Sequence, residues 1–348
     1  MTDDLQLGLV LGYWFAQPPT GVADQVALAE DLGFDSVWTA EAYGSDCFTP
    51  LAWHGAATSR IRLGTAVCQM AARTPVATAM SALTLDHLTG GRFILGLGAS
   101  GPQVVEGWYG QPYPKPLART REYVEIVRRV LARDEPLAYD GDHFQLPRTG
   151  EGTTGLGKPL RSITHPLRAD LPIYLGAEGP KNVAMAAEIA DGWLPMFMSP
   201  GLDDHYRACL EEGWARPGAR RGPDDFEVAN LVQVVIDDDV ERAADVVRMS
   251  LGFYIGGMGA KEVNFHAELF SRMGYAEDVA RIQDLFLGGR KEEAIASVPL
   301  ALVEDVALVG PEAKIRDDLE RWRRTCVTTL LVSGPPHQLR QITDLVRG

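Results

Sequence analysis

Short apolar runs alternate with longer segments of helical periodicity along most of this 348-residue chain. Residues 5–12 form the first apolar run, and Val22, Val26, Ala29 and Leu32 follow it at helical spacing. Apolar residues three and four positions apart mark one face of a helix, whereas a short apolar run is typical of a buried strand. This opening segment therefore predicts a β-strand followed by an α-helix.

The same strand–helix pair recurs along the chain. Further strands are predicted at residues 36–39, 61–67, 93–97, 173–175, 193–194, 228–236 and 328–332. Further helices are predicted at about residues 50–58, from Pro75 onward, and at 123–131, 183–190, 240–251 and 315–322. Because no linker or low-complexity break divides the pairs, the pattern predicts one (β/α)8 TIM barrel, an α/β fold, as a single domain over residues 1–348. Two insertions are expected, one at about residues 133–170 with a small hairpin and a largely helical one at about residues 255–300.

Composition and charge exclude several classes of protein. A hydrophobic content of 46% with 23% charged residues is that of a globular chain able to bury a full core. The net charge of −14 argues against nucleic acid as a partner, because phosphate contacts need clustered Lys and Arg. No run approaches the ~20 apolar residues of a membrane span, and the first residues lack the basic start of a signal peptide. We expect a cytoplasmic protein that binds neither membranes nor nucleic acid.

The residue types that bind metals show no metal-binding spacing. The cysteines are scattered, and the histidines form neither H-x-H nor H-E-x-x-H. Scattered cysteines fit reduced thiols in a cytoplasm. We therefore expect no metal site and look for chemistry at the carboxyl ends of the strands, where barrel enzymes carry their active sites.

The fourth predicted strand runs into a segment almost without side chains. Gly96, Gly98, Ala99, Ser100 and Gly101 leave room for a flat or phosphorylated ligand against main-chain N–H groups, although a tight turn that binds nothing is the alternative. The segment also matches the dinucleotide-binding pattern G-x-G-x-x-G, which requires a helix to begin at its last glycine. Prolines and glycines follow, and they exclude a helix of normal length, so we interpret the match as fortuitous.

Residues near two other strand ends are candidates for the site. Glu41 follows the second strand and can accept a hydrogen bond from a bound ring or move a proton, or it is a solvated loop acid. Ala66 and Val67 end the third strand with side chains on which a flat ring could rest, although packing alone would explain them. His54 follows the second strand closely enough to lie near the barrel mouth, or it is a structural histidine.

The loop after the fifth predicted strand has the features of an anion site. Gly176, Ala177, Gly179, Pro180 and Lys181 stand directly before a predicted helix. Proline suits the first helical position, glycine lets an anion approach the backbone, and the free N–H groups carry partial positive charge. The alternative is an ordinary glycine-containing turn. It is not a Walker loop, because G-x-x-x-x-G-K-[ST] does not occur in the sequence.

Several segments together give the chain a resemblance to a known family. These segments are residues 61–67, 90–93, 100–108, 179–182 and 190–193. Through these segments, the chain resembles the bacterial luciferase-like monooxygenase superfamily along nearly its whole length. It is most similar to the actinobacterial oxidoreductases that use the 8-hydroxy-5-deazaflavin coenzyme F420.

This resemblance implies a barrel that holds coenzyme F420, or alternatively FMN, at the carboxyl ends of its strands. It implies a non-prolyl cis peptide bond between Ala66 and Val67 that supports the ring, and a ring contact from Glu41. The residues after the fourth strand that would meet the ring or its linker are Ala99, Ser100 and Gly101. The residues that would bind the cofactor phosphate are Gly176, Ala177, Gly179, Pro180 and Lys181. A homodimer formed through the early helices is also implied.

One departure from the family limits what carries over. Deazaflavin enzymes that oxidise sugar phosphates place a histidine after the strand-two acid and a glutamate after the strand-four glycines. Ala42 and Gly101 stand at these positions here. The proton-transfer scheme of those enzymes therefore does not carry over, and we do not expect sugar-phosphate oxidation.

The expected function is hydride transfer between C5 of the deazaflavin and a small organic substrate. We expect reduction of an activated C=C or C=O bond, with Glu41, Tyr43, His54 and Tyr109 as the catalytic candidates for moving the proton. One alternative is an FMN-dependent monooxygenase, in which the reduced flavin reacts with oxygen. Another is a non-catalytic barrel that stores or carries the coenzyme.

Overall fold

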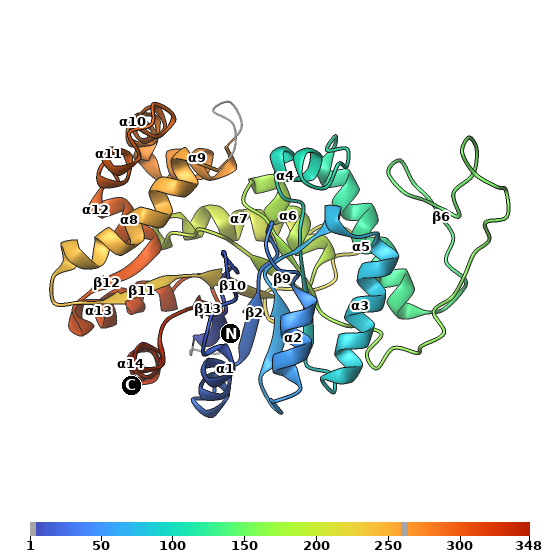
Figure 1. The fold of residues 1–348 in the computed structure, drawn as a ribbon, viewed down its shortest axis with the longest axis horizontal. Helices are drawn as coiled ribbons and strands as arrows, with labels where there is room; N and C mark the ends of the chain where they lie inside the picture. Colours follow the sequence, from blue (N-terminus) through green and yellow to red (C-terminus); the bar gives the residue numbers. More distant parts are fainter. Residues whose placement is uncertain (1–4, 259–263) are drawn as a thin grey trace. The chain divides into compact units, whose positions relative to one another are not determined.

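The computed structural model describes residues 5–258 and 264–348, so residues 259–263 of the second predicted insertion lie outside the described residues (Figure 1). The described chain forms two compact units. The first unit contains the strand at the N-terminus, residues 28–35 and everything from Ala177 onward, whereas the second contains residues 11–27 and 36–176. No helix in the described ranges is both long and apolar enough to span a bilayer.

Parallel strands form the centre of the second unit. They are β2 (Ser36–Thr39), β3 (Arg62–Thr65), β4 (Cys68–Gln69), β5 (Phe93–Gly98) and β8 (Ile173–Gly176). β2 pairs with β3, both β3 and β4 pair with β5, and β5 pairs with β8. Every residue of β5 is buried, which is the property expected of a strand covered on both faces.

The helices that contribute to this unit lie where the sequence predicts them, except for the short helix α4 (Pro102–Gly107). They are α1 (Val22–Asp31, which ends in the first unit), α2 (Phe48–Gly55), α3 (Pro75–Leu88), α4 and α5 (Pro116–Ala132), with a 3-10 turn at Met70–Ala72. α3 and α5 lie side by side (Figure 1). The predicted hairpin in the first insertion is confirmed as the antiparallel pair β6 (Tyr139–Asp140) and β7 (Gln145–Leu146).

Arg92 and Gly64 each determine a close contact within the second unit. The guanidinium of Arg92 donates to the carbonyl oxygens of Gly55 and Thr58 at 3.0 Å, just where α2 ends. A cation at this point offsets the partial negative charge of the last helical carbonyls. Gly64 leaves no room for a side chain, because a Cβ there would stand 2.2 Å from the Trp38 ring.

The first unit also has a parallel strand core. Its strands are β1 (Gln6–Val10), β9 (Gly192–Leu194), β10 (Glu227–Leu231), β11 (Gln233–Ile236), β12 (Ala307–Gly310) and β13 (Thr329–Val332). β13 pairs with β1 and β10, β10 pairs with β9, and β11 pairs separately with β12.

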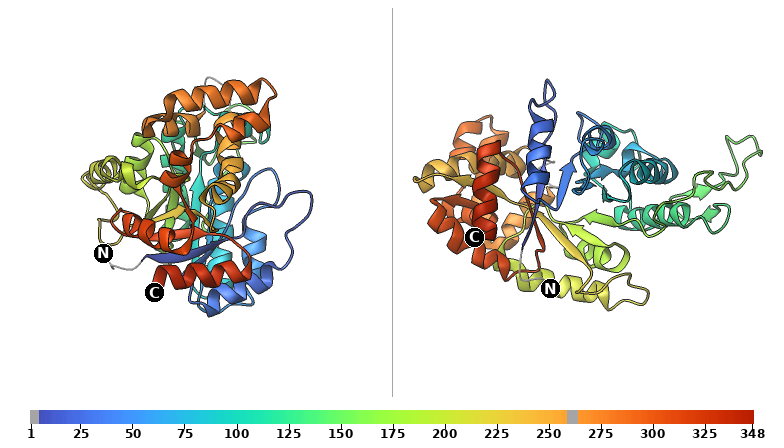
Figure 2. Two further views of the ribbon diagram at one scale, coloured as in Figure 1. Left: turned by 90° about the vertical axis from the view of Figure 1, so that its left-hand side faces the viewer. Right: turned by 90° about the horizontal axis from the view of Figure 1, so that it is seen from below.

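The helices of the first unit include a group that packs around α8. They are α6 (Pro180–Ile189), α7 (Asp203–Trp214), α8 (Val240–Gly256), α9 (Phe265–Phe270), α10 (Ala276–Leu287), α11 (Lys291–Ala296), α12 (Leu300–Val306), α13 (Glu312–Arg323) and α14 (Pro336–Arg347). A 3-10 turn spans Pro200–Leu202 and a π turn spans Ser271–Tyr275. Figure 2 shows α8, α10 and α11 grouped together in gold and orange, around a core that includes Leu251, Ile255 and Ile282.

Three details differ from the sequence-based expectation. The apolar run at residues 228–236 is two strands, because the chain leaves β13 at Val232 and pairs with β12 instead. β12, α7 and α14 were not predicted from the pattern at all. A helix does begin directly after Gly101, but it ends at Gly107, so it is shorter than the dinucleotide-binding motif requires.

Candidate functional site

Glu41 is a buried carboxylate held by an arginine that the sequence analysis did not identify. Its side-chain oxygens accept two hydrogen bonds of 2.7 Å from Arg73, and the backbone N–H of Gln69 donates a third at 2.9 Å. The hydrogen bond to Glu41 raises the pKa of Arg73 further above its usual range. Tyr123, from α5, donates to the carbonyl oxygen of Arg73 at 3.2 Å and fixes this backbone in place. Glu41 is therefore neither a solvated loop acid nor an unpaired base.

Two buried thiols lie beside this ion pair. One side-chain donor atom each of Glu41, Cys47 and Cys68 lies within 4.8 Å of the others. Burial, followed by the hydrogen bond to Cys68, raises the pKa of Cys47 far above its usual range, so this thiol stays protonated. The guanidinium of Arg73 already neutralises the carboxylate and lies 3.7 Å from the Cys68 sulfur. A metal ion would have to displace this cation.

The end of the third strand lies against Glu41 and the fourth strand. The Ala66–Val67 peptide bond is cis, as the resemblance implied. The N–H of Glu41 donates to the Val67 carbonyl oxygen at 3.3 Å. Val67 packs so closely on β5 that a Cβ at Gly98 would stand 2.4 Å from its Cγ2 atom. The structure thus brings together Glu41, Ala66 and Val67, which the sequence analysis selected separately.

The segment after β5 is partly buried and contains an unusual backbone conformation. Ala99 is half-buried, and Ser100 has a φ of 59°, in the left-handed region that non-glycine residues seldom occupy. The Ser100 carbonyl oxygen accepts a hydrogen bond of 3.2 Å from Tyr113. Gly101 is the N-cap of α4, and no side chain caps that helix.

The two tyrosine candidates occupy different surroundings. Burial, and then the nearby charge of Glu41, raises the pKa of Tyr109 above its usual value, so its phenol is protonated at neutral pH. Tyr43 is exposed, and its ring lies edge-on to Trp108 with 6.3 Å between the centroids. The Tyr109 phenol therefore lies close enough to Glu41 to be affected by its charge.

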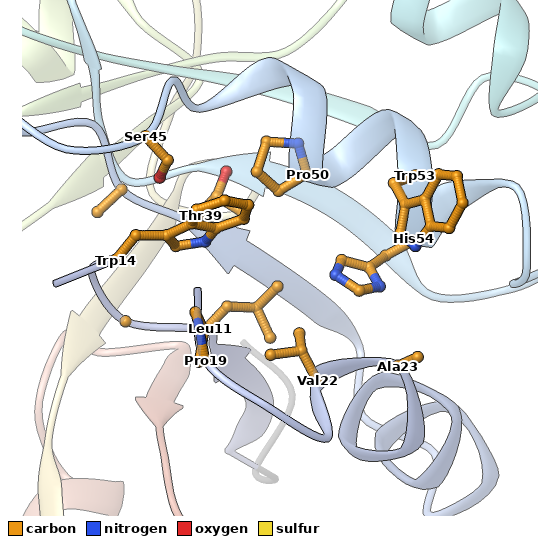
Figure 3. A pocket seen from close by; sticks show the side chains of 12 residues that line it. Leu11, Trp14, Pro19, Val22, Ala23, Thr39, Ser45, Pro50, Trp53 and His54 are labelled. Carbon is orange, nitrogen blue, oxygen red and sulfur yellow. The ribbon is translucent and has the colours of Figure 1, made fainter. Parts of the chain in front are cut away.

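His54 lines a pocket in the second unit (Figure 3). The cavity volume is about 250 Å³. Its lining residues are Leu11, Gly12, Trp14, Pro19, Val22, Ala23, Thr39, Ala40, Ser45, Pro50, Trp53 and His54. Burial lowers the pKa of His54 below its usual 6.5. The sequence suggested a role for this histidine but gave no sign of the pocket, which is assembled from β2, α2 and the segment that leads into α1.

In the loop after β8, an uncapped helix begins. Gly179 is the N-cap of α6 and Pro180 its first residue, and no side chain caps the helix. A Cβ placed on Gly179 would meet nothing within 4 Å, so the space beside it is open. Lys181 is exposed, and the Ala177 carbonyl oxygen accepts a hydrogen bond of 2.7 Å from Trp193. Gly176 is the last residue of β8.

A histidine–carboxylate pair in the first unit could not be predicted from the sequence. Nδ1 of His266, on α9, lies 2.8 Å from Oε1 of Glu178, in the loop before α6. The imidazole packs edge-on against the rings of Tyr254 and Phe197, with centroid distances of 5.0 and 5.7 Å. Within the described residues, Oε2 of Glu178 has no hydrogen-bond partner. No local spacing could have revealed this pair, because one partner lies in a helical insertion far along the chain.

Comparison with known proteins identifies the family. The sequence profile described as "Luciferase-like monooxygenase" matches residues 7–329. The chain belongs to this luciferase-like family. Within it, a Mycobacterium tuberculosis protein named as a proposed coenzyme F420-dependent oxidoreductase is 58% identical over 347 residues, which cover 99% of this chain and 100% of the relative.

Solved structures with the same fold cover nearly the whole chain. The coenzyme F420-dependent tetrahydromethanopterin reductase of Methanopyrus kandleri aligns with a TM-score of 0.76 and 25% identity, over 99% of this chain and 98% of that one. An F420-dependent secondary alcohol dehydrogenase aligns with a TM-score of 0.77 and 18% identity, over 99% and 100%. These likenesses confirm the (β/α)8 barrel fold of the luciferase-like family.

Two sets of donors in this luciferase-like chain fit, each by itself, a phosphate and a flat ring. The uncapped start of α6, with open space at Gly179 and a lysine beside it, offers N–H groups and a positive charge to a phosphate. The backbone at Ser100 and the buried Glu41–Arg73 pair offer hydrogen-bonding groups to a ring.

Proposed function

We propose that this protein is a coenzyme F420-dependent oxidoreductase that acts on a small organic substrate. The observation that carries the proposal is the 58% identity, over 99% of the chain, to the M. tuberculosis protein of that name. The reductase from M. kandleri, whose name includes the same coenzyme, supports it. An FMN-dependent monooxygenase is the second candidate, because the family profile is described as that of a monooxygenase.

In this proposal, two sets of residues hold the coenzyme. The ring contacts come from Glu41, Ala66, Val67, Ala99, Ser100 and Gly101. The phosphate contacts come from Gly176, Ala177, Gly179, Pro180 and Lys181. When bound, coenzyme F420 supplies a carbon that gives or accepts a hydride, and the protein contributes position and exclusion of water.

Tyr109 is the group that we propose for the proton. In the reductive direction the substrate gains a hydride at carbon and a proton, and in the oxidative direction it loses both. The Tyr109 phenol keeps its proton at neutral pH, so it can donate to an oxygen that develops negative charge. Glu41 is occupied by Arg73, so its role is to position the ring and not to move a proton. Tyr43 and His54 are the further candidates.

We also propose a homodimer in the cytoplasm, with the chain acting as a single domain. Met80 and Leu88 are exposed two turns apart on one face of α3, and a second copy would cover them. The cysteines at 47, 68, 209 and 326 are all unpaired and buried, which fits a reducing compartment.

Titration of the full-length protein with coenzyme F420 and FMN side by side tests the proposal. We expect quenching of tryptophan fluorescence at micromolar coenzyme F420 and no comparable effect of FMN. Tighter binding of FMN would move the assignment to the monooxygenase.

A matched pair of variants locates the phosphate. Gly179→Ala adds a methyl group to open space, so the fold is expected to tolerate it, but the methyl would obstruct a phosphate at α6. The control is Gly222→Ala, where the nearest atom to the added Cβ would be 4.0 Å away. Equal coenzyme affinities of the two variants would refute the phosphate assignment.

A further inference from the structure

We propose that the pocket lined by Leu11, Trp14, Val22, Thr39, Trp53 and His54 binds the substrate, and that it selects a small uncharged molecule with a compact apolar body and one carbonyl or hydroxyl group (Figure 3). The inference rests on the proposed function and adds the class of substrate to it. All of these residues belong to the second unit.

The size of the pocket limits the ligand. Its volume is about 250 Å³. A cavity of about 150 Å³ holds one benzene molecule, so this pocket has room for a ligand of about ten non-hydrogen atoms. The indoles of Trp14 and Trp53 contribute flat apolar walls (Figure 3). A substituted ring or a short branched chain fits this space, whereas a nucleotide does not.

The charge of the lining excludes ionic ligands. Among the described residues that line the pocket, none is Asp, Glu, Lys or Arg. Burial lowers the pKa of His54, so the imidazole is neutral at pH 7. An ion in this pocket would lose part of its hydration without gaining a counter-charge, which is unfavourable.

The polar groups of the pocket match one neutral polar group of a ligand. In the described part of the chain, neither the His54 imidazole nor the Ser45 hydroxyl has a hydrogen-bond partner. Thr39 already donates to the Cys47 carbonyl oxygen at 2.6 Å, so it can only accept from a ligand. Figure 3 shows Ser45 and Thr39 toward one side of the pocket and His54 toward the other. A neutral imidazole offers one donor and one acceptor, which suits a ketone, an aldehyde or an alcohol.

The test uses two aromatic probes of nearly equal size, uncharged acetophenone and anionic benzoate, titrated into the full-length protein by calorimetry. We expect acetophenone to bind with a dissociation constant of about 1 mM or below and benzoate at least about tenfold more weakly. Ala23→Leu places a larger side chain in the pocket and should weaken acetophenone binding at least about tenfold. Ala27→Leu, one turn further along α1 and also exposed, is the matched control. His54→Ala should weaken binding about fivefold through loss of one hydrogen bond.

Several outcomes would overturn the inference. They are absence of acetophenone binding, equal binding of benzoate, or equal affinities of the Ala23→Leu and Ala27→Leu variants. A change in oligomeric state on Ala23→Leu, measured by sedimentation, would assign this surface to a second copy of the chain instead. A parallel titration with coenzyme F420 separates the two proposals. If coenzyme F420 binds and acetophenone does not, only the assignment of the substrate pocket is wrong. If coenzyme F420 itself does not bind, the proposed function is refuted.

Discussion

Removal of Arg73 is the perturbation whose consequences the structure defines best. Arg73→Met keeps an unbranched side chain about as long as the arginine stem and deletes the guanidinium that donates to both oxygens of Glu41. The Glu41 side chain is 5% exposed, so its charge has little access to water once the partner is lost. Loss of one member of a buried ion pair costs about 3–5 kcal/mol. The Arg73 side chain is 21% exposed, which places the expected loss near the lower end, at about 3 kcal/mol of unfolding free energy.

Removal of the charge from Glu41 should reduce the unfolding free energy by less than removal of Arg73. Glu41→Gln leaves a cation, but Arg73 reaches solvent more readily than Glu41 does, and the glutamine carbonyl can still accept one hydrogen bond. We expect a loss of about 1–2 kcal/mol. In the double variant neither charge remains, so its loss should be smaller than the sum of the two single losses.

Urea unfolding followed by circular dichroism measures these differences. The control is Arg290→Ala, which removes an exposed arginine just before α11 that pairs with Glu293. Loss of this exposed pair should not measurably change the urea concentration at the unfolding midpoint. If Arg73→Met were no more destabilising than this control, or if the two single losses simply added, the pair would not be the coupled buried contact described above.

Four further predictions follow from single contacts. Tyr109→Phe should bind coenzyme F420 normally and lower turnover about 100-fold, because it removes the proposed proton donor. Since burial raises the pKa of Tyr109 above its usual 10.0, the wild-type rate should show no loss from phenol ionisation below pH 10. A fall in the wild-type rate at lower pH that Tyr109→Phe does not show would contradict the role of Tyr109. Gly64→Ala should destabilise the protein by about 3 kcal/mol, because its Cβ would stand 2.2 Å from the Trp38 ring, whereas Gly107→Ala, with nothing within 4 Å, should have little effect in the same unfolding assay. Because burial lowers the pKa of His54 from 6.5, the unfolded chain binds a proton at this residue more readily than the folded chain does. The free energy of unfolding should therefore fall as the pH drops below about 6.5, and His54→Gln should reduce that fall. Identical pH–stability curves for the two proteins would refute this prediction. Glu178→Gln should weaken coenzyme F420 binding about threefold, because it loosens the contact of α9 with the loop before α6. The control is Glu268→Gln, which changes an exposed residue of α9. Equal dissociation constants of the two variants for coenzyme F420 would refute this coupling.

Most of the order of strands and helices, and the loops expected to carry the site, could be predicted from the sequence alone. The apolar runs and helical stripes are local signals, because each strand or helix buries its own face whatever it packs against. They predicted β5, α6 and the hairpin of the first insertion within a few residues. They did not predict that residues 228–236 form two strands. The first part of this apolar run pairs with β13 and the second part with β12, and only the folded chain decides where one pairing ends and the other begins.

The resemblance to the luciferase-like family added features that no periodicity contains. It predicted the cis bond at Ala66–Val67 and pointed to the acid at position 41. The roles of the site residues stay predictions until the coenzyme titration is done. The sequence did indicate that the loop after the third strand belongs near the site, and Arg73 lies in that loop.

Tertiary structure alone decided which polar groups meet. Glu41 and Arg73 are 32 residues apart, and their hydrogen bonds exist because parallel strands end at the same edge of the sheet. Glu178 and His266 are paired because the helical insertion returns α9 to the loop before α6. The pocket at His54 requires α2, β2 and the start of α1 together. Hydrophobic pattern is a property of each segment, whereas charge pairing and cavity shape are properties of surfaces that only folding brings into contact.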